Sequence, residues 1–183
     1  MSRMKNGEKT VALNITLTAI FAALCCAATM IAVPLPFGYF NLGDIIVVLS
    51  AWLLGPVFGA LASGLGAALA DLILGFATYA PATFVIKFLV AVVAFSLFGL
   101  LNKITFLRKT RVISCIVSAA LAELVMVSGY FVFEAFIMGY GVGGALSSVV
   151  GNLMQAVVGA VGSTLLMAVL SASKTVKDLF KIN

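Results

Sequence analysis

Long uninterrupted stretches of apolar residues dominate this chain, and each is long enough to cross a lipid bilayer. A transmembrane helix needs roughly 20 predominantly apolar residues. Overall, 63% of the 183 residues are hydrophobic and 9% are charged, whereas about a quarter of the residues in soluble domains are charged. The sequence therefore excludes a soluble fold and predicts an all-α integral membrane protein with a single membrane domain.

The sequence lacks the residues that several chemistries need. It contains no histidine, no GxxxxGK[ST] phosphate-binding loop and no pair of acidic residues at metal-ligand spacing. Catalysis, a bound metal, a cofactor and direct use of ATP are therefore not expected. Cys25, Cys26 and Cys115 form neither a CxxC motif nor a disulfide framework, so we interpret them as small core residues.

Positive charges predict which ends of the helices face the cytoplasm. The 11 Lys and Arg residues lie in three clusters, and Lys87 is the exception inside an apolar stretch. The clusters are Arg3, Lys5 and Lys9; Lys103, Arg108, Lys109 and Arg111; and Lys174, Lys177 and Lys181. Short basic loops stay in the cytoplasm, so an even number of spans separates one cluster from the next.

This rule leads to six transmembrane helices with both termini in the cytoplasm. Four stretches each make one span: 10–33, 81–102, 112–137 and 144–172. The stretch 43–75 has to supply two helices, and Gly55-Pro56 is the predicted break because proline ends a helix at the residue before it. The domain is thus predicted over 10–172, between cytoplasmic tails at 1–9 and 173–183.

Polar side chains inside the apolar stretches concentrate in the predicted outer half of the membrane. An ionised side chain at mid-membrane costs about 2.5–3.5 kcal/mol on insertion scales, so each needs a partner or a wet cavity. We interpret this asymmetry as a solute cavity open to the outside. The candidate binding residues are Tyr39, Asn41, Asp44, Asp71, Tyr79, Thr83, Lys87, Glu134, Asn152 and Gln155. The alternative is hydrogen bonding between helices or contact with lipid headgroups.

Three further features carry separate expectations. Glu123 lies near the predicted midplane and is interpreted as a buried structural acid. The loop 34–43 combines proline, glycine and aromatic residues, which suits either a lid over the cavity or an aromatic belt at the membrane interface. Ala19, Ala23 and Ala27 recur every four residues on one helix face, which packs either inside the monomer or against a separate membrane subunit.

A family resemblance rests on a series of short motifs. These motifs are Asn41-Leu-Gly-Asp44, Leu53-Leu-Gly-Pro56, Ala70-Asp71-Leu72, Tyr79-Ala-Pro81 and Thr83-Phe-Val-Ile-Lys87. Because these motifs occur in this order, together with the alanine pattern and without an ATPase motif, the chain resembles the substrate-binding S component of an energy-coupling factor (ECF) vitamin transporter. The riboflavin-type subgroup is the nearest match. The resemblance covers roughly 10–172, and its specific part is 41–87.

The resemblance implies a mechanism and a set of partners. Such a protein binds a vitamin or precursor from outside, docks on a transmembrane coupling subunit that carries two cytoplasmic ATPases, and topples in the cell membrane to release its ligand. The family's docking motif carries over to Ala19 and Ala23, with Ala27 on the same face. Its lid carries over to the loop 34–43.

The expected ligand is a small heteroaromatic alcohol. A cavity with Lys87, carboxylates and amides favours a vitamin B6 form or a hydroxymethylpyrimidine, followed by riboflavin and then cobalamin. Two other classes remain as alternatives. One is an autonomous secondary carrier coupled to protons through Glu123, although no internal repeat supports it. The other is a structural subunit without a ligand.

Overall fold

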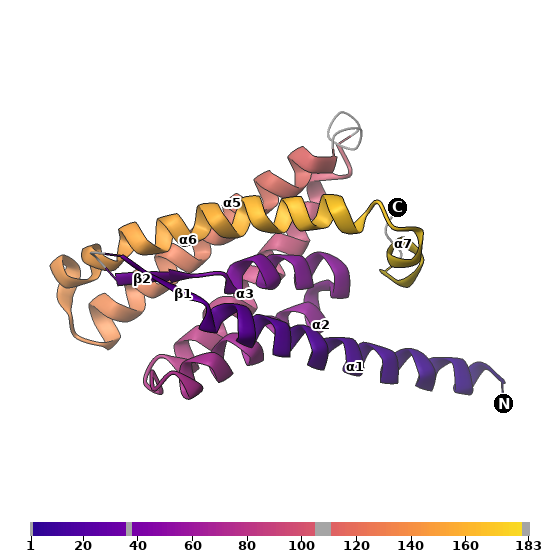
Figure 1. Cartoon of the computed structure of the whole chain (residues 1–183), viewed down its shortest axis with the longest axis horizontal. Coiled ribbons are helices and arrows are strands. Elements are labelled where there is room, and N and C mark those ends of the chain that lie inside the picture. The colour runs from indigo at the N-terminus through magenta and orange to yellow at the C-terminus, as the bar shows by residue number, and fades with distance from the viewer. Residues whose placement is uncertain (1, 36–37, 105–110, 181–183) are drawn as a thin grey trace.

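The structure, a computed structural model, is a bundle of apolar helices with a short β-hairpin at one end (Figure 1). It describes residues 2–35, 38–104 and 111–180. The helical elements in this part of the chain are α1 (Ser2–Met30), α2 (Gly43–Ile73), α3 (Ala80–Leu101), α5 (Arg111–Val132), the π-helical turn η1 (Phe133–Ile137), α6 (Gly141–Leu170) and α7 (Lys174–Phe180).

Five of the helical stretches are long and apolar enough to cross a membrane: Val11–Met30, Gly43–Ile73, Ala80–Leu101, Arg111–Ile137 and Gly141–Leu170. Large apolar side chains are exposed along all of them, including Ile20, Leu69 and Val157. Side chains of this kind are stable on an outer surface only when lipid covers it. The all-helical membrane domain predicted from the sequence is confirmed at this level, while the sidedness of the termini stays a prediction.

The predicted break at Gly55-Pro56 is present inside α2. Gly55 has φ 85° and ψ −178°, a backbone conformation that interrupts the helix and favours glycine. The two halves of α2 fold back on each other, because Ser50 Oγ lies 2.8 Å from Ser63 Oγ and donates to the Gly59 carbonyl at 3.1 Å. The residues before and after the break therefore make two antiparallel half-helices, as the sequence predicted.

Most of the segment 34–43, which the sequence analysis treated as a loop, belongs to a β-hairpin. Strands β1 (Ala32–Leu35) and β2 (Gly38–Asn41) pair antiparallel, with Ala32 opposite Asn41 and Val33 opposite Phe40. Residues 36 and 37 lie outside the described part. The sequence analysis did not predict these strands, whose pairing satisfies backbone groups that an irregular loop would leave without partners. The lid and the aromatic belt both stay predictions for 34–43.

Small residues allow the helices of the core to approach closely. Alanine and serine side chains of α2 and α3, among them Ala51, Ala60, Ser63 and Ala91, are fully or almost fully buried. Packing of this kind, rather than the hydrophobic effect, drives helix association in lipid. Helix α2 packs against α1, α3 and α6, while α5 packs against α6 and α3 (Figure 1).

The described parts of both predicted tails are largely helical. Helix α1 begins at Ser2, so it includes residues 2–9 of the predicted N-terminal tail. Helix α7 lies within 173–183, and its Phe180 ring contacts Phe21 edge-on with centroids 6.2 Å apart. The start of α1 and helix α7 lie at the end of the bundle opposite the hairpin (Figure 1). Of the basic clusters, Arg108, Lys109 and Lys181 lie outside the described residues.

Candidate functional site

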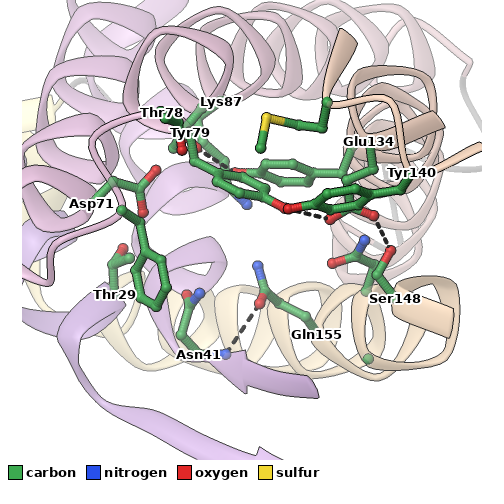
Figure 2. Close-up of a pocket in the computed structure, with 16 residues that line it drawn as sticks. Thr29, Asn41, Asp71, Thr78, Tyr79, Lys87, Glu134, Tyr140, Ser148 and Gln155 are labelled. Atoms are coloured by element: carbon green, nitrogen blue, oxygen red, sulfur yellow. Dashed lines mark hydrogen bonds between the residues drawn. The ribbon is translucent and has the colours of Figure 1, made fainter. Parts of the chain in front are cut away.

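A cavity of about 430 Å³ opens at the hairpin end of the bundle (Figure 2). Its wall combines residues from α1, β2, α2, the segment that connects α2 to α3, α3 itself, α5, η1 and α6. Figure 2 shows Asp71 and Thr29 on one side of the space and Glu134, Tyr140 and Ser148 on the other. This volume lies within the range of roughly 300–1,000 Å³ that encloses drug-sized ligands.

Most of the residues predicted for a binding site come together here. Eight of them line the cavity: Asn41, Asp71, Tyr79, Thr83, Lys87, Glu134, Asn152 and Gln155. Asp44 does not line it but is fully buried beneath, in contact with Lys87 and Gln155. Tyr39 belongs to β2, and its side chain lies outside the described part.

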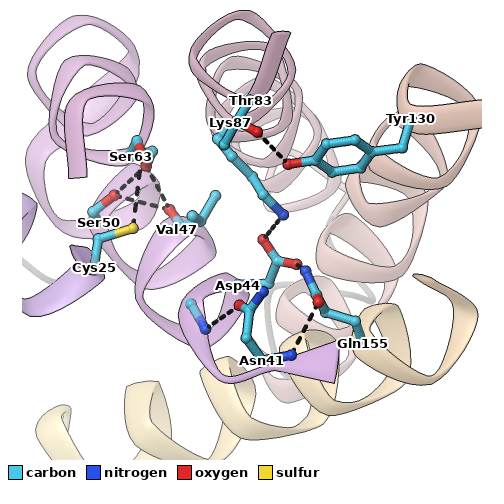
Figure 3. Close-up of polar contacts among 11 residues, drawn as sticks. Cys25, Asn41, Asp44, Val47, Ser50, Ser63, Thr83, Lys87, Tyr130 and Gln155 are labelled. Carbon is cyan, nitrogen blue, oxygen red and sulfur yellow. Dashed lines mark hydrogen bonds and ion pairs between the residues drawn. The ribbon is translucent and has the colours of Figure 1, made fainter. Parts of the chain in front are cut away.

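A buried ion pair forms the floor of the cavity (Figure 3). Lys87 Nζ donates to Asp44 Oδ1 at 2.6 Å, and both side chains are at most 4% exposed. Gln155 Nε2 donates to the second oxygen, Oδ2, at 2.5 Å. A buried pair is held only when the remaining lone pairs and protons are also satisfied, and Gln155 supplies that further hydrogen bond.

The same glutamine ties the hairpin to the floor. The backbone N–H of Asn41, at the end of β2, donates to Gln155 Oε1 at 3.1 Å. The Asn41 side chain turns back and accepts from the Gly43 N–H at 2.9 Å, which fixes the turn into α2. A continuous chain of polar contacts thus runs from the hairpin through α6 to α2 and α3 (Figure 3).

A second polar cluster surrounds Glu134 in the π-helical turn. Glu134 accepts hydrogen bonds from the Tyr79 hydroxyl at 3.4 Å and from the Ser148 hydroxyl. Burial raises the pKa of the Tyr79 phenol, and the neighbouring Tyr140 hydroxyl and Glu134 carboxylate add to this rise. Tyr79 therefore keeps its proton at physiological pH and acts as a donor to Glu134.

The wall between these clusters holds Asp71 and two hydroxyl groups. Asp71 is 7% exposed, and its Oδ2 has no hydrogen-bond partner among the described residues. Thr83 and Tyr130 share a hydrogen bond of 3.0 Å between their hydroxyls. Lys87 Nζ lies 5.4 Å from the centre of the Tyr130 ring, which adds a cation–π contact to its ion pair.

Eight further lining residues were not predicted from the sequence: Thr29, Phe76, Thr78, Tyr130, Met138, Tyr140, Ser148 and Gly151. Three of the four tyrosines in the chain belong to the wall. The position of these tyrosines within or beside apolar spans was a usable signal in the sequence. An amphipathic ring at such a position suits a ligand site as well as the membrane interface.

Glu123 and the alanine face lie outside the cavity. Glu123 is fully buried in α5, and neither of its carboxyl oxygens has a hydrogen-bond partner in the described part of the chain. Ala19, Ala23 and Ala27 are all exposed on α1, whereas Phe21 and Cys25 of the same helix are buried against the core. No group of three or more metal-ligating side chains occurs among the described residues.

Two comparisons with known proteins bear on this site. The family model described as "ECF-type riboflavin transporter, S component" matches residues 9–172. A protein of Pyrococcus woesei, described as an uncharacterized protein in a gap 3′ region, is 37% identical over 139 residues. That alignment covers 75% of this chain and 86% of the relative.

Proposed function

The chain belongs to the family of ECF-type riboflavin transporter S components, and from this premise we propose that its cavity captures a water-soluble vitamin for uptake. Members of this family are subunits of membrane transporters and not enzymes, and they reside in the cell membrane. The capture itself, the direction of uptake and the docking partners are the proposal.

The observation that carries this proposal is a polar cavity among the described residues of a largely apolar bundle. Hydroxyl, amide and carboxylate groups from six helical elements converge on a space of about 430 Å³, and the hairpin is tied to its floor through Gln155. Polar groups in a membrane domain are costly unless they serve a site or each other. A solute with several hydrogen-bonding groups and an aromatic ring matches this wall best.

We propose riboflavin as the first ligand to test. The description of the matched family names riboflavin, and the tyrosines in the wall suit a flat heteroaromatic ring. A vitamin B6 form and a hydroxymethylpyrimidine, which the sequence placed first, remain in the test panel. Cobalamin comes last because the molecule is far larger than this cavity. Equilibrium binding to the purified protein in detergent distinguishes them, and failure of the whole panel to bind contradicts the proposal.

Asn152 provides a first mutational test of the cavity. Its amide lines the wall from α6. Asn152→Ala is expected to weaken binding of the active panel member by about 1–2 kcal/mol, the contribution of one amide hydrogen bond. Isothermal titration calorimetry measures the change. Unchanged affinity would remove Asn152 from the site.

The proposed docking face is tested by enlarging one alanine. Transport in this model requires a coupling subunit that itself rides on two ATPase subunits, and the exposed Ala19, Ala23 and Ala27 form a smooth surface for it. Ala23→Leu is expected to leave vitamin binding unchanged and to reduce co-purification with the coupling subunit at least about tenfold, because close helix packing does not tolerate the larger side chain.

The matched control for this variant is Ala120→Leu, an equally exposed alanine on α5. It adds the same side chain to a different face and is expected to co-purify normally. Equal co-purification of both variants would contradict the docking face. Vitamin uptake into liposomes that hold this chain without coupling and ATPase subunits would instead favour an autonomous carrier.

A further inference from the structure

The balance of charge around the cavity is negative. Two carboxylates, Asp71 and Glu134, line it, and neither forms a salt bridge within the part of the chain that the structure describes. Glu134 is hydrogen-bonded by the neutral hydroxyls of Tyr79 and Ser148. These contacts satisfy its oxygens without cancelling its charge.

The lysine in the wall offsets these carboxylates only in part, because it is already paired. Lys87 is 3% exposed, and its ammonium group is 2.6 Å from Asp44, which lies beneath the cavity. Gln155 fixes Asp44 from the other side at 2.5 Å. The Lys87–Asp44 pair is therefore close to neutral as seen from the cavity, and an anionic ligand would have to break it to gain a counter-charge.

Helix ends are the remaining source of positive potential. The residues before the first turns of α3 and α6, Tyr79 and Tyr140, both line the cavity. A helix N-terminus contributes roughly half a positive charge. Two such ends amount to about one positive charge, which is less than the two negative charges of Asp71 and Glu134.

Asp71 also has an unused acceptor. The residue is 7% exposed and lines the cavity, and its Oδ2 has no hydrogen-bond partner in the described ranges. An acceptor left in this state carries an uncompensated desolvation cost, which is larger for a charged group. A ligand that brings an N–H or O–H group, or a protonated amine, recovers that energy, whereas a ligand anion adds repulsion.

From these observations we infer that the cavity takes a neutral or cationic ligand that donates a hydrogen bond to Asp71, and rejects anions. The vitamin would then be bound as the free alcohol or amine and not as its phosphate ester or as a carboxylate. This inference rests on the proposed function and adds to it the charge of the substrate and the residue that selects it.

The experiment compares each vitamin with its own phosphate ester. The pairs are riboflavin with flavin mononucleotide, pyridoxine with pyridoxine 5′-phosphate, and hydroxymethylpyrimidine with its monophosphate. For the pair that binds, the free alcohol is expected to bind at least about a hundredfold more tightly, since the phosphate of the ester would face like charges in the cavity. Calorimetry at one fixed ionic strength gives both dissociation constants.

Asp71→Asn tests the residue. It keeps the side-chain size and removes the charge, so binding of the alcohol is expected to weaken about tenfold and the preference over the ester to shrink by a similar factor. The control is Asp178→Asn, which removes the same charge from an exposed position on α7 and should change neither constant. Thermal unfolding of both variants checks that the fold is retained.

The possible failures are distinguishable. If no member of any pair binds, the proposed function falls and this inference falls with it. If the ester binds as tightly as the alcohol, the inference on charge is overturned while vitamin capture stands. If the alcohol is preferred but Asp71→Asn retains the full preference, the assignment to Asp71 is overturned. The wild-type comparison decides the charge question even if the Asp71 variant does not fold.

Discussion

Replacing Lys87 by methionine is expected to abolish ligand binding and to lower the free energy of unfolding by about 3–5 kcal/mol, because Asp44 is left as an uncompensated buried charge. Methionine fills a similar volume, so the loss reports the ammonium group and not a void. Asp44 is fully buried, and its second side-chain partner within the described residues is the Gln155 amide. The floor of the cavity then loses the contact that holds α3 against the start of α2.

The measurement is unfolding in mixed micelles of increasing SDS content, followed by vitamin binding under native conditions. Lys103→Met is the matched control, since Lys103 is exposed just after α3 and its loss should change neither quantity. Adding Asp44→Asn to the Lys87 variant removes the stranded charge and should recover part of the stability without restoring binding. A stable, binding-competent Lys87→Met protein would show that the ion pair has no role in the site.

The second large effect is expected at the fold-back of α2. A Cβ at Gly59 would lie 2.5 Å from the Ser50 carbonyl oxygen and 2.8 Å from the Ala51 Cα, both backbone atoms that cannot rotate away. Gly59→Ala is therefore expected to push the two half-helices apart and to destabilise the protein by about 3 kcal/mol. The variant should also bind less vitamin, because the two ends of α2 position Asp44 and Asp71.

Gly99→Ala provides the control for helix propensity. Gly99 lies in α3, and a Cβ there would meet no atom within 4 Å. The same substitution should stabilise this position by about 0.5–1 kcal/mol, since alanine is the better helix former. Unfolding curves that move in opposite directions for the two variants support close packing at Gly59. Parallel shifts would contradict it.

Hydropathy and proline placement made the helical framework predictable. Lipid removes most alternatives to a helix, so the long apolar stretches and the break at Gly55-Pro56 could be located from the sequence. The polar residues of the cavity were also predictable as a set. Each is costly in a bilayer unless it joins others, and eight of the ten predicted residues line one space.

Which of these polar residues contact each other could not be predicted from the sequence. Asp44 and Lys87 are separated by an entire hairpin of half-helices, and their contact depends on how far α2 folds back. The β-hairpin was missed because Pro34 and Pro36 lower strand propensity, while the pairing of Val33 with Phe40 outweighs that effect. Thr29 and Ser148 were missed because a single hydroxyl in an apolar helix commonly bonds to its own backbone.

The order of the site residues along the chain matters for how the protein is made. Lys87 leaves the ribosome roughly 70 residues before Gln155, an interval of several seconds at about 5–20 residues per second. During that time the charged pair of α2 and α3 sits in the bilayer without its amide partner or the wall that α6 provides. The site is therefore completed late in biogenesis, and chains arrested before this last long helix are expected to be the ones that quality-control proteases remove.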